Sequence, residues 1–308
     1  MYPQNVARAL RTSMVEVSCL ASVSITFTTI IQMIALAVAQ QWGAGWPMAS
    51  YVLWWINTAM ALFAVMGIPY IFVKLQAPGI KAIVPAVLLP LISALTSAAG
   101  GGVISYLEVG VGIPMAMAFA DVFIARLFER EFMPMDQVYQ DMILCGPFGQ
   151  GSFALLILGQ VVRSGAFAAY NRGSFLTAEA AIPIGFASQF AGLLSWGYGT
   201  FWWGYAIISI LHTAFKQPGG WRRMQYSLSA WSLVFPWGVY ANGAVQLGKV
   251  MDSPAFKVWS TALTLMLIII WIVNHIFTIR GLITGRILSL QHGWRVGQYQ
   301  AGEVDKQV

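Results

Sequence analysis

The chain has 308 residues, of which 58% are hydrophobic and only 9% are Asp, Glu, Lys or Arg. Soluble domains typically carry about 25% charged residues, so this composition excludes a water-soluble globular protein. The formal net charge of +6 does not indicate a nucleic-acid surface, because the cations stand singly at the ends of apolar runs, as cytoplasmic anchors do. The sequence predicts one integral membrane domain.

Apolar runs fill almost the whole chain, and each is long enough for a bilayer crossing, which needs about 20 predominantly apolar residues. In chain order the eight predicted spans are 14–40, 47–73, 82–106, 109–128, 139–162, 182–215, 226–248 and 255–283. We therefore expect an all-α, polytopic transmembrane helix bundle. Its transmembrane domain would be 14–283, between an N-terminal segment, 1–13, and a C-terminal tail, 284–308.

The Lys and Arg residues give an independent test of the span count. With eight spans, thirteen of the 17 Lys and Arg residues fall on the side of the membrane that holds both chain ends. The opposite side has only four: Arg163, Arg172, Lys249 and Lys257. Cytoplasmic loops carry an excess of Lys and Arg. Both ends are therefore predicted to lie in the cytoplasm, and the bilayer is the first expected partner.

The odd-numbered spans are richer in proline, glycine and hydroxyl residues than the even-numbered ones. The third span contains Pro85, Pro90 and the glycine run 100–102, the fifth contains Pro147, and the seventh contains Pro236. Lipid offers no water to loosened backbone, so broken helices exist at membrane depth only where they line an enclosed cavity. We expect spans one, three, five and seven to form an inner ring of kinked helices around a central pore, with the even spans facing lipid.

Small and polar residues of these spans supply the hydroxyl and backbone N–H groups that can replace the hydration shell of an anion. The predicted anion path is lined by Ser93, Thr96, Ser97, Gly100, Gly146, Gly149, Gln150, Gly151, Ser152, Ser232 and Asn242. The alternative is close helix packing through small residues. In the cluster 146–152 the path is favoured, because a Gln among three glycines and a proline exceeds what packing requires.

Charged residues inside the predicted spans are few. Asp121, in the fourth span, is a candidate for carrying a coupling proton. Its alternative role is an ion pair with Arg126, about one helical turn further along. The three histidines do not have metal-ligand spacing, and no hydrolase, metalloprotease or nucleotide-binding motif is present. We therefore expect no metal, no cofactor and no catalytic residue.

Four runs resemble one known family. They are YVLWW at 51–55, MPMDQVYQDMILCGPFGQGSFALLILG at 133–159, YSLSAWSLVFPWG at 226–238 and DSPAFKV at 252–258. These runs are similar to the tellurite-resistance/dicarboxylate transporter family, which includes fungal sulfite efflux pumps, C4-dicarboxylate (malic acid) transporters and plant slow-type anion channels. The GPFGQGSF stretch is most similar to the sulfite-efflux branch.

The resemblance implies a fold of ten helices in five hairpins, with inner helices around a pore that a phenylalanine plugs. The matching residue here is Phe235, which is thereby expected to be the gate; its alternative role is a packed aromatic residue beside a proline kink. Because the chain shows eight spans, we expect the family's first hairpin to be absent. Some branches of the family form trimers, so a homotrimer is a further expectation.

These observations together predict a protein of the plasma membrane that exports a small anion, with sulfite favoured. Malate, another C4-dicarboxylate or an acidic secondary metabolite is the alternative substrate within the same class. A non-transporting membrane scaffold, or truncated pseudo-transporter, is the alternative from another class, because the absent hairpin would leave the inner ring open. An integral membrane enzyme is less favoured, because it should show clustered His or carboxylate residues at depth.

Overall fold

The structure is a computed structural model that describes residues 10–39, 41–43, 45–76, 79–80, 83–101, 104–129, 132–135, 137–216 and 226–285. Most of the predicted end segments, at 1–9 and 286–308, therefore lies outside the described residues, as does one glycine of the run 100–102. So do eight of the cations that predict the orientation: Arg8, Lys81, Arg130, Arg222, Arg223, Arg286, Arg295 and Lys306.

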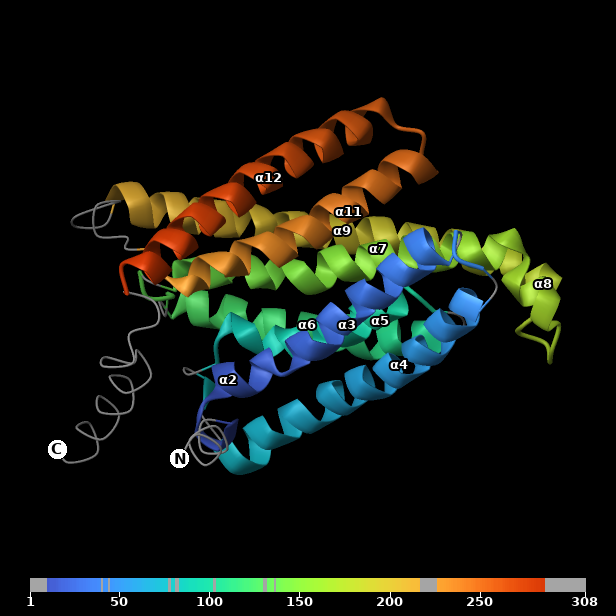
Figure 1. The fold of residues 1–308 in the computed structure, drawn as a ribbon, viewed down its shortest axis with the longest axis horizontal. Helices are drawn as coiled ribbons and strands as arrows, with labels where there is room; N and C mark the ends of the chain where they lie inside the picture. Colours follow the sequence, from blue (N-terminus) through green and yellow to red (C-terminus); the bar gives the residue numbers. More distant parts are fainter. Residues whose placement is uncertain are drawn as a thin grey trace.

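The described residues form eight helical rods, several of which contain a short 3₁₀ or π turn (Figure 1). In chain order the rods are α2–α3–η1 (Met14–Cys19, Ala21–Met33, Ile34–Val38), α4–η2 (Gly45–Ile71, Phe72–Gln76), η4–α5 (Pro85–Leu88, Leu89–Ala98), α6 (Ile104–Phe128), η5–α7–η6–α8 (Val138–Cys145, Gly146–Val161, Val162–Ala166, Phe167–Tyr170), α9 (Ala178–Lys216), η7–α11 (Leu228–Leu233, Val234–Val250) and α12 (Pro254–Ile283). The only β-type pairing among the described residues is an isolated bridge between Arg172 and Leu176. The predicted all-α class is confirmed.

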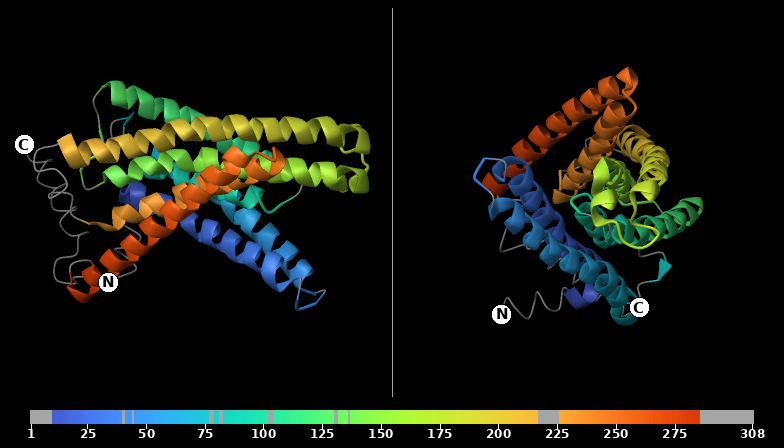
Figure 2. Two further views of the ribbon diagram at one scale, coloured as in Figure 1. Left: turned by 90° about the horizontal axis from the view of Figure 1, so that it is seen from above. Right: turned by 90° about the vertical axis from the view of Figure 1, so that its right-hand side faces the viewer.

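Five of these rods are long and apolar enough to cross a membrane: Met14–Val38, Gly45–Gln76, Ile104–Phe128, Val138–Tyr170 and Pro254–Ile283. The polytopic membrane bundle is thereby confirmed, while eight crossings stay a prediction. The rod α9 has 39 residues, but its many Trp, Tyr and Gly residues keep its mean hydropathy low. The start of α2 and the end of α12 lie at the same end of the bundle (Figures 1 and 2), as an even number of crossings requires.

Three of the odd-numbered spans begin with a 3₁₀ turn rather than with an α-helix. The turns η4, η5 and η7 lead directly into α5, α7 and α11. Pro85 starts η4, Pro147 is the second residue of α7, and Pro236 is the third residue of α11. Proline has no N–H and a fixed φ, so it suits the first helical turn, where the N–H would lack a partner. The predicted kinks are therefore changes of helix type near these prolines.

Burial separates the centre of the bundle from its periphery. The most apolar part of Val138–Tyr170 has 89% of its residues buried, whereas the most apolar part of Pro254–Ile283 has only 11% buried. The helix α7 packs against α5, α6, α9 and α11, which places it at the centre (Figures 1 and 2). Every residue of 90–98 in α5 is also buried. The third and fifth spans are thus interior, and the eighth span is peripheral.

The first span does not fit the expected alternation. Its most apolar part is 28% buried, less than the 39% of the second span. The helix α3 packs against α4 and α5, and its other side exposes Val23, Ile30 and Met33. These apolar side chains face away from the protein. Membership of the first span in an inner ring stays a prediction.

An aromatic stack joins α9 to α11 beside α7. The ring of Tyr240 lies parallel to Trp196 at 4.7 Å between ring centroids and nearly parallel to Trp203 at 5.7 Å. The Trp196 indole N–H donates to the Tyr240 carbonyl oxygen at 3.1 Å, and the Tyr240 hydroxyl bonds Thr200 at 2.9 Å. Offset aromatic pairs add to the gain from burial alone. The stack fixes α11 against α9 at the depth of the 146–152 segment of α7.

Candidate functional site

Buried polar groups of α4 and of α7 bond the same part of α5. The Ser97 hydroxyl of α5 bonds the Thr58 hydroxyl of α4 at 2.9 Å, and the Trp54 indole N–H donates to the Ser97 carbonyl oxygen at 3.0 Å. From α7, the Gln150 side-chain amide donates to the Leu95 carbonyl oxygen at 3.4 Å. Ser97 is 0% exposed and Gln150 is 4% exposed. Both predicted path residues therefore point into the protein rather than toward lipid.

The other hydroxyl groups of the predicted path differ in whether they have partners. The Ser93 hydroxyl donates to the Pro90 carbonyl oxygen and the Thr96 hydroxyl to the Ile92 carbonyl oxygen, both at 2.7 Å. The Ser152 hydroxyl of α7 is completely buried and has no hydrogen-bond partner among the described residues. Buried polar atoms are nearly always paired. Ser152 is therefore the predicted path residue with an unused hydrogen-bonding group.

The glycines of the 146–152 segment let neighbouring helices approach closely. A Cβ at Gly146 would lie 2.9 Å from Ile92 Cδ1, one at Gly149 would lie 2.8 Å from the Tyr240 backbone nitrogen, and one at Gly151 would lie 2.7 Å from Ile113 Cδ1. Each of these distances is below any normal contact of a Cβ atom. Close packing, the alternative interpretation, thus accounts for all three glycines. Their role in an anion path stays a prediction.

The structure does not gather all the predicted path residues in one place. Gly100, in the turn that follows α5, and Asn242, in α11, are exposed, and Ser232 in η7 is partly buried. Phe235, the expected gate, is the second residue of α11 and packs against the main hydrophobic core while remaining partly exposed. It directly follows the 3₁₀ turn η7, where the helix changes type. The gate role stays a prediction.

Asp121 lies exposed on α6, and the alternative ion pair with Arg126 is not formed. Arg126 is 7% exposed, and its guanidinium donates to the Ile83 carbonyl oxygen. It lines a small pocket together with Asp141 and Tyr205. The buried acidic residue near Arg126 is therefore Asp141, which accepts a hydrogen bond from Ser209 at 2.7 Å. Asp141 lies inside the predicted fifth span, 139–162. A charged residue in an apolar run was the signal that could have identified it as a buried acidic residue.

Glu108 is the most unusual polar residue that the sequence analysis missed. It was placed between the third and fourth spans, but α6 begins at Ile104 and carries Glu108 in its second turn. The side chain is 0% exposed, and neither carboxyl oxygen has a hydrogen bond of normal geometry within the described chain. The hydroxyls of Ser97 and Thr58 lie close enough to interact with it. Hydropathy alone could not find it, because burial of Glu108 depends on the packing of three helices.

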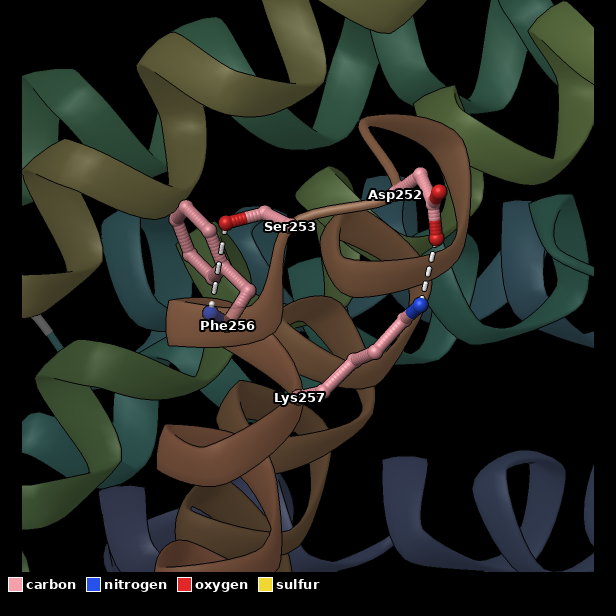
Figure 3. A network of polar contacts seen from close by, with 4 residues as sticks. All are labelled: Asp252, Ser253, Phe256 and Lys257. Carbon is pink, nitrogen blue, oxygen red and sulfur yellow. Dashed lines mark hydrogen bonds and ion pairs between the residues drawn. The ribbon is translucent and has the colours of Figure 1, made fainter.

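The turn between α11 and α12 carries a small polar network (Figure 3). The Ser253 hydroxyl oxygen accepts a hydrogen bond from the Phe256 backbone N–H at 3.5 Å, and the Lys257 ammonium pairs with the Asp252 carboxylate. Asp252 has a φ of +46°, a left-handed conformation that Asp and Asn tolerate better than most residues. The hydrogen bond and positive charge of Lys257 hold the pKa of the Asp252 carboxyl below its ordinary value. This network holds the turn between the last two helices.

Residues 1–279 match the family model described as voltage-dependent anion channel. The chain is 25% identical over 269 residues to a sulfite efflux pump of Arthroderma benhamiae, covering 82% of this chain and 68% of the relative. A sulfite efflux pump of Saccharomyces cerevisiae is 24% identical over 268 residues, covering 68% and 57%. A malic acid transport protein of Schizosaccharomyces pombe is 24% identical over 106 residues, covering 34% and 23%. No solved structure matches the chain.

Proposed function

The chain belongs to the voltage-dependent anion channel family, and from this premise we propose that it moves a small anion across a membrane, with sulfite as the favoured substrate. The proposed direction is export. The family description and the relatives' names denote channels and transporters rather than enzymes. The resemblance to the tellurite-resistance/dicarboxylate transporter family in the sequence is thereby confirmed, and an integral membrane enzyme is not proposed.

The observation that carries the proposal is the polar character of the two most buried helices. Neither α5 nor α7 contains Asp, Glu, Lys, Arg or His, yet Ser97, Gln150 and Ser152 lie buried in them. Neutral hydroxyl and amide groups can bind an anion without holding it as tightly as a buried cation would. Weak binding is what a conducting path requires, because the ion must also leave.

In the proposed mechanism the anion passes along α5, α7 and α11. Hydroxyl and amide groups at 93–100, 146–152 and 232–242 replace its hydration shell, and Phe235 obstructs the path until its side chain rotates or α11 shifts. The 3₁₀ turn before α11 supports this role, because 3₁₀ hydrogen bonds are weaker and such turns often mark hinges. Phe235 is also only partly buried, so its ring has space to move.

Sulfite is favoured over malate by the extent of the matches. The similarity to the Arthroderma sulfite efflux pump covers 82% of this chain, whereas that to the malic acid transport protein covers 34%. We further propose a plasma-membrane location with both ends in the cytoplasm, and a homotrimer as the assembly. The non-transporting scaffold remains the alternative from another class, because the first span is mostly exposed.

Anion uptake by proteoliposomes that contain the purified protein tests the proposal. We expect uptake of labelled sulfite that exceeds uptake of labelled malate and that is absent from protein-free vesicles. Uptake of malate alone would support the dicarboxylate alternative. Uptake of neither anion by a protein that is monodisperse and thermally stable would support the scaffold.

A further inference from the structure

Glu108 occupies an environment that leaves its charge unbalanced. It lies in the second turn of α6, is completely buried, and has both carboxyl oxygens unpaired among the described residues. Burial of a carboxylate without a partner is costly. Ionisable residues in membrane spans are rare and usually functional.

The helices packed around Glu108 provide no cation. The helices α4, α5 and α7 contain no Asp, Glu, Lys, Arg or His, and the tyrosines of α4, Tyr51 and Tyr70, are exposed. On α6 the nearest titratable side chain is Tyr106, which is partly buried beside Ser188 of α9. The titratable and charged residues of α9 are Glu179, Tyr198, Tyr205, His212 and Lys216. Only neutral hydroxyl groups, from Ser97 and Thr58, interact with the Glu108 carboxyl.

Glu108 is joined to the proposed anion path through one turn of α5. Ser97 is next to Glu108 and bonds Thr58, while the Leu95 carbonyl, two residues earlier, accepts the hydrogen bond of Gln150. Glu108 and Gln150 therefore both contact the same turn of α5. A helix with its side chains is about 10 Å across, so a charge on Glu108 and an anion at Gln150 would be separated by roughly that distance. Like charges at this distance repel measurably in a protein interior.

We propose that Glu108 is a proton-binding site that controls anion passage, with the protonated carboxyl permitting passage and the carboxylate opposing it. This inference rests on the proposed function. A hydronium ion transfers its proton to one Glu108 oxygen, so that an O–H bond forms and a water molecule is left. The reverse transfer to water restores the carboxylate. A protonated carboxyl is neutral, can donate to a neighbouring hydroxyl, and removes the repulsion felt by an anion near Gln150.

The residues just before Glu108 are also closely packed. A Cβ at Gly101 would lie 2.0 Å from the Trp54 ring and 2.2 Å from the Ser105 hydroxyl, so both side chains pack directly against Gly101. The Ser105 hydroxyl is itself buried without a partner among the described residues. We include Ser105 in the proton route, because its hydroxyl lies one turn before Glu108 and can relay a hydrogen bond.

The test compares Glu108→Gln with the wild-type protein and with Glu129→Gln, which removes an exposed carboxylate at the end of the same helix. Sulfite uptake is measured from acidic to alkaline pH. Because sulfite itself gains and loses a proton, each value is expressed relative to wild type at the same pH. We expect E108Q to exceed wild type roughly tenfold at alkaline pH, the effect of two unit charges about 10 Å apart at a typical protein dielectric constant, and to equal it at acidic pH. E129Q should follow wild type throughout.

Three results would overturn the proposal. The first is a constant ratio of E108Q to wild type across the pH range while both proteins transport sulfite. The second is loss of the pH dependence in Asp121→Asn but not in E108Q, which would place the proton site at Asp121. The third is an infrared pH titration in which the carboxyl C=O band assigned by E108Q difference spectra never changes. The infrared titration needs no transport activity, so it can fail independently of the proposed function. If E108Q does not fold, Glu108→Asp replaces it, and its titrating band should shift in frequency.

Discussion

Gly149 of α7 and Tyr240 of α11 are in backbone contact, with the position of a Cβ at Gly149 only 2.8 Å from the Tyr240 nitrogen and 2.9 Å from its Cα. Backbone atoms cannot rotate away as side chains can. This contact fixes the separation of two helices that the proposed path needs, and the rings of Trp196 and Trp203 stack on the Tyr240 ring.

Gly149→Ala is therefore expected to destabilise the protein, by roughly 1–3 kcal/mol as for other overpacked interiors. Thermal unfolding of the detergent-solubilised protein measures the change. Gly204→Ala in α9 is the matched control, since no atom lies within 4 Å of its Cβ position. That variant should be as stable as wild type or gain up to about 1 kcal/mol of helix propensity. Equal unfolding temperatures for the two variants would contradict the packing role of Gly149.

Phe235→Ala is expected to raise anion flux several-fold if its ring obstructs the path, because a smaller side chain leaves the conduit open. Sulfite uptake by proteoliposomes measures the effect. Phe201→Ala, which removes an aromatic ring that is 56% exposed on α9, should leave the flux unchanged. Unchanged or reduced flux in the Phe235 variant, from a protein of normal stability, would show that this ring only packs.

The sequence was sufficient to predict where the helices lie along the chain, but not which residues of neighbouring helices each side chain contacts. The apolar runs predict the rods because membrane helices need continuous hydrophobic residues, and Pro90, Pro147 and Pro236 lie close to the points where three rods change from 3₁₀ to α-helix. Gly149 could not be assigned in this way. A glycine that exposes its amide to an ion and one that admits a neighbouring backbone look alike until the neighbour is known.

Glu108 shows a second limit. The glycine-rich stretch before Glu108 favoured a loop, so the predicted third span ended before this residue and the fourth began after it. Its burial arises only because α4, α5 and α6 meet at Ser97 and Thr58.

The exposure of the first span is a third feature that the sequence did not predict. Its hydroxyl and amide residues favoured an inner helix: Ser18, Ser22, Ser24, Thr26, Thr28, Thr29 and Gln32. Thr28 and Thr29, however, donate to carbonyl oxygens one turn earlier in the same helix.

Asp252→Asn is expected to lower the unfolding temperature slightly at neutral pH, because it removes the charge that pairs with Lys257 and keeps a residue that tolerates a positive φ. Lys257 depresses the pKa of Asp252, so the stabilisation is present above the unfolded pKa of about 3.9 and is lost as the pH falls through the lower folded pKa. The difference between variant and wild type should therefore vanish in strong acid.

Salt and a double-mutant cycle provide the controls for this surface pair. Both partners are exposed, so high ionic strength should also reduce the difference. In a Lys257→Gln background, Asp252→Asn should have no further effect at neutral pH. A difference that persists unchanged in acid, in high salt and in the Lys257 variant would assign the effect to the backbone of the turn.

The central claim is that Gln150, which is buried, and Ser232, which is partly buried, lie along a path that water and anions enter during transport, and cysteine accessibility tests it most directly. In a background with Cys19→Ser and Cys145→Ala, single cysteines are introduced as Gln150→Cys, Ser232→Cys and Leu265→Cys, the last at a position that is 57% exposed on the peripheral helix α12. A membrane-impermeant anionic thiol reagent is then added to proteoliposomes. The account predicts that the cysteines at 150 and 232 react and that the one at 265, surrounded by lipid, does not. No reaction at 150 and 232, in variants that fold normally, would contradict it.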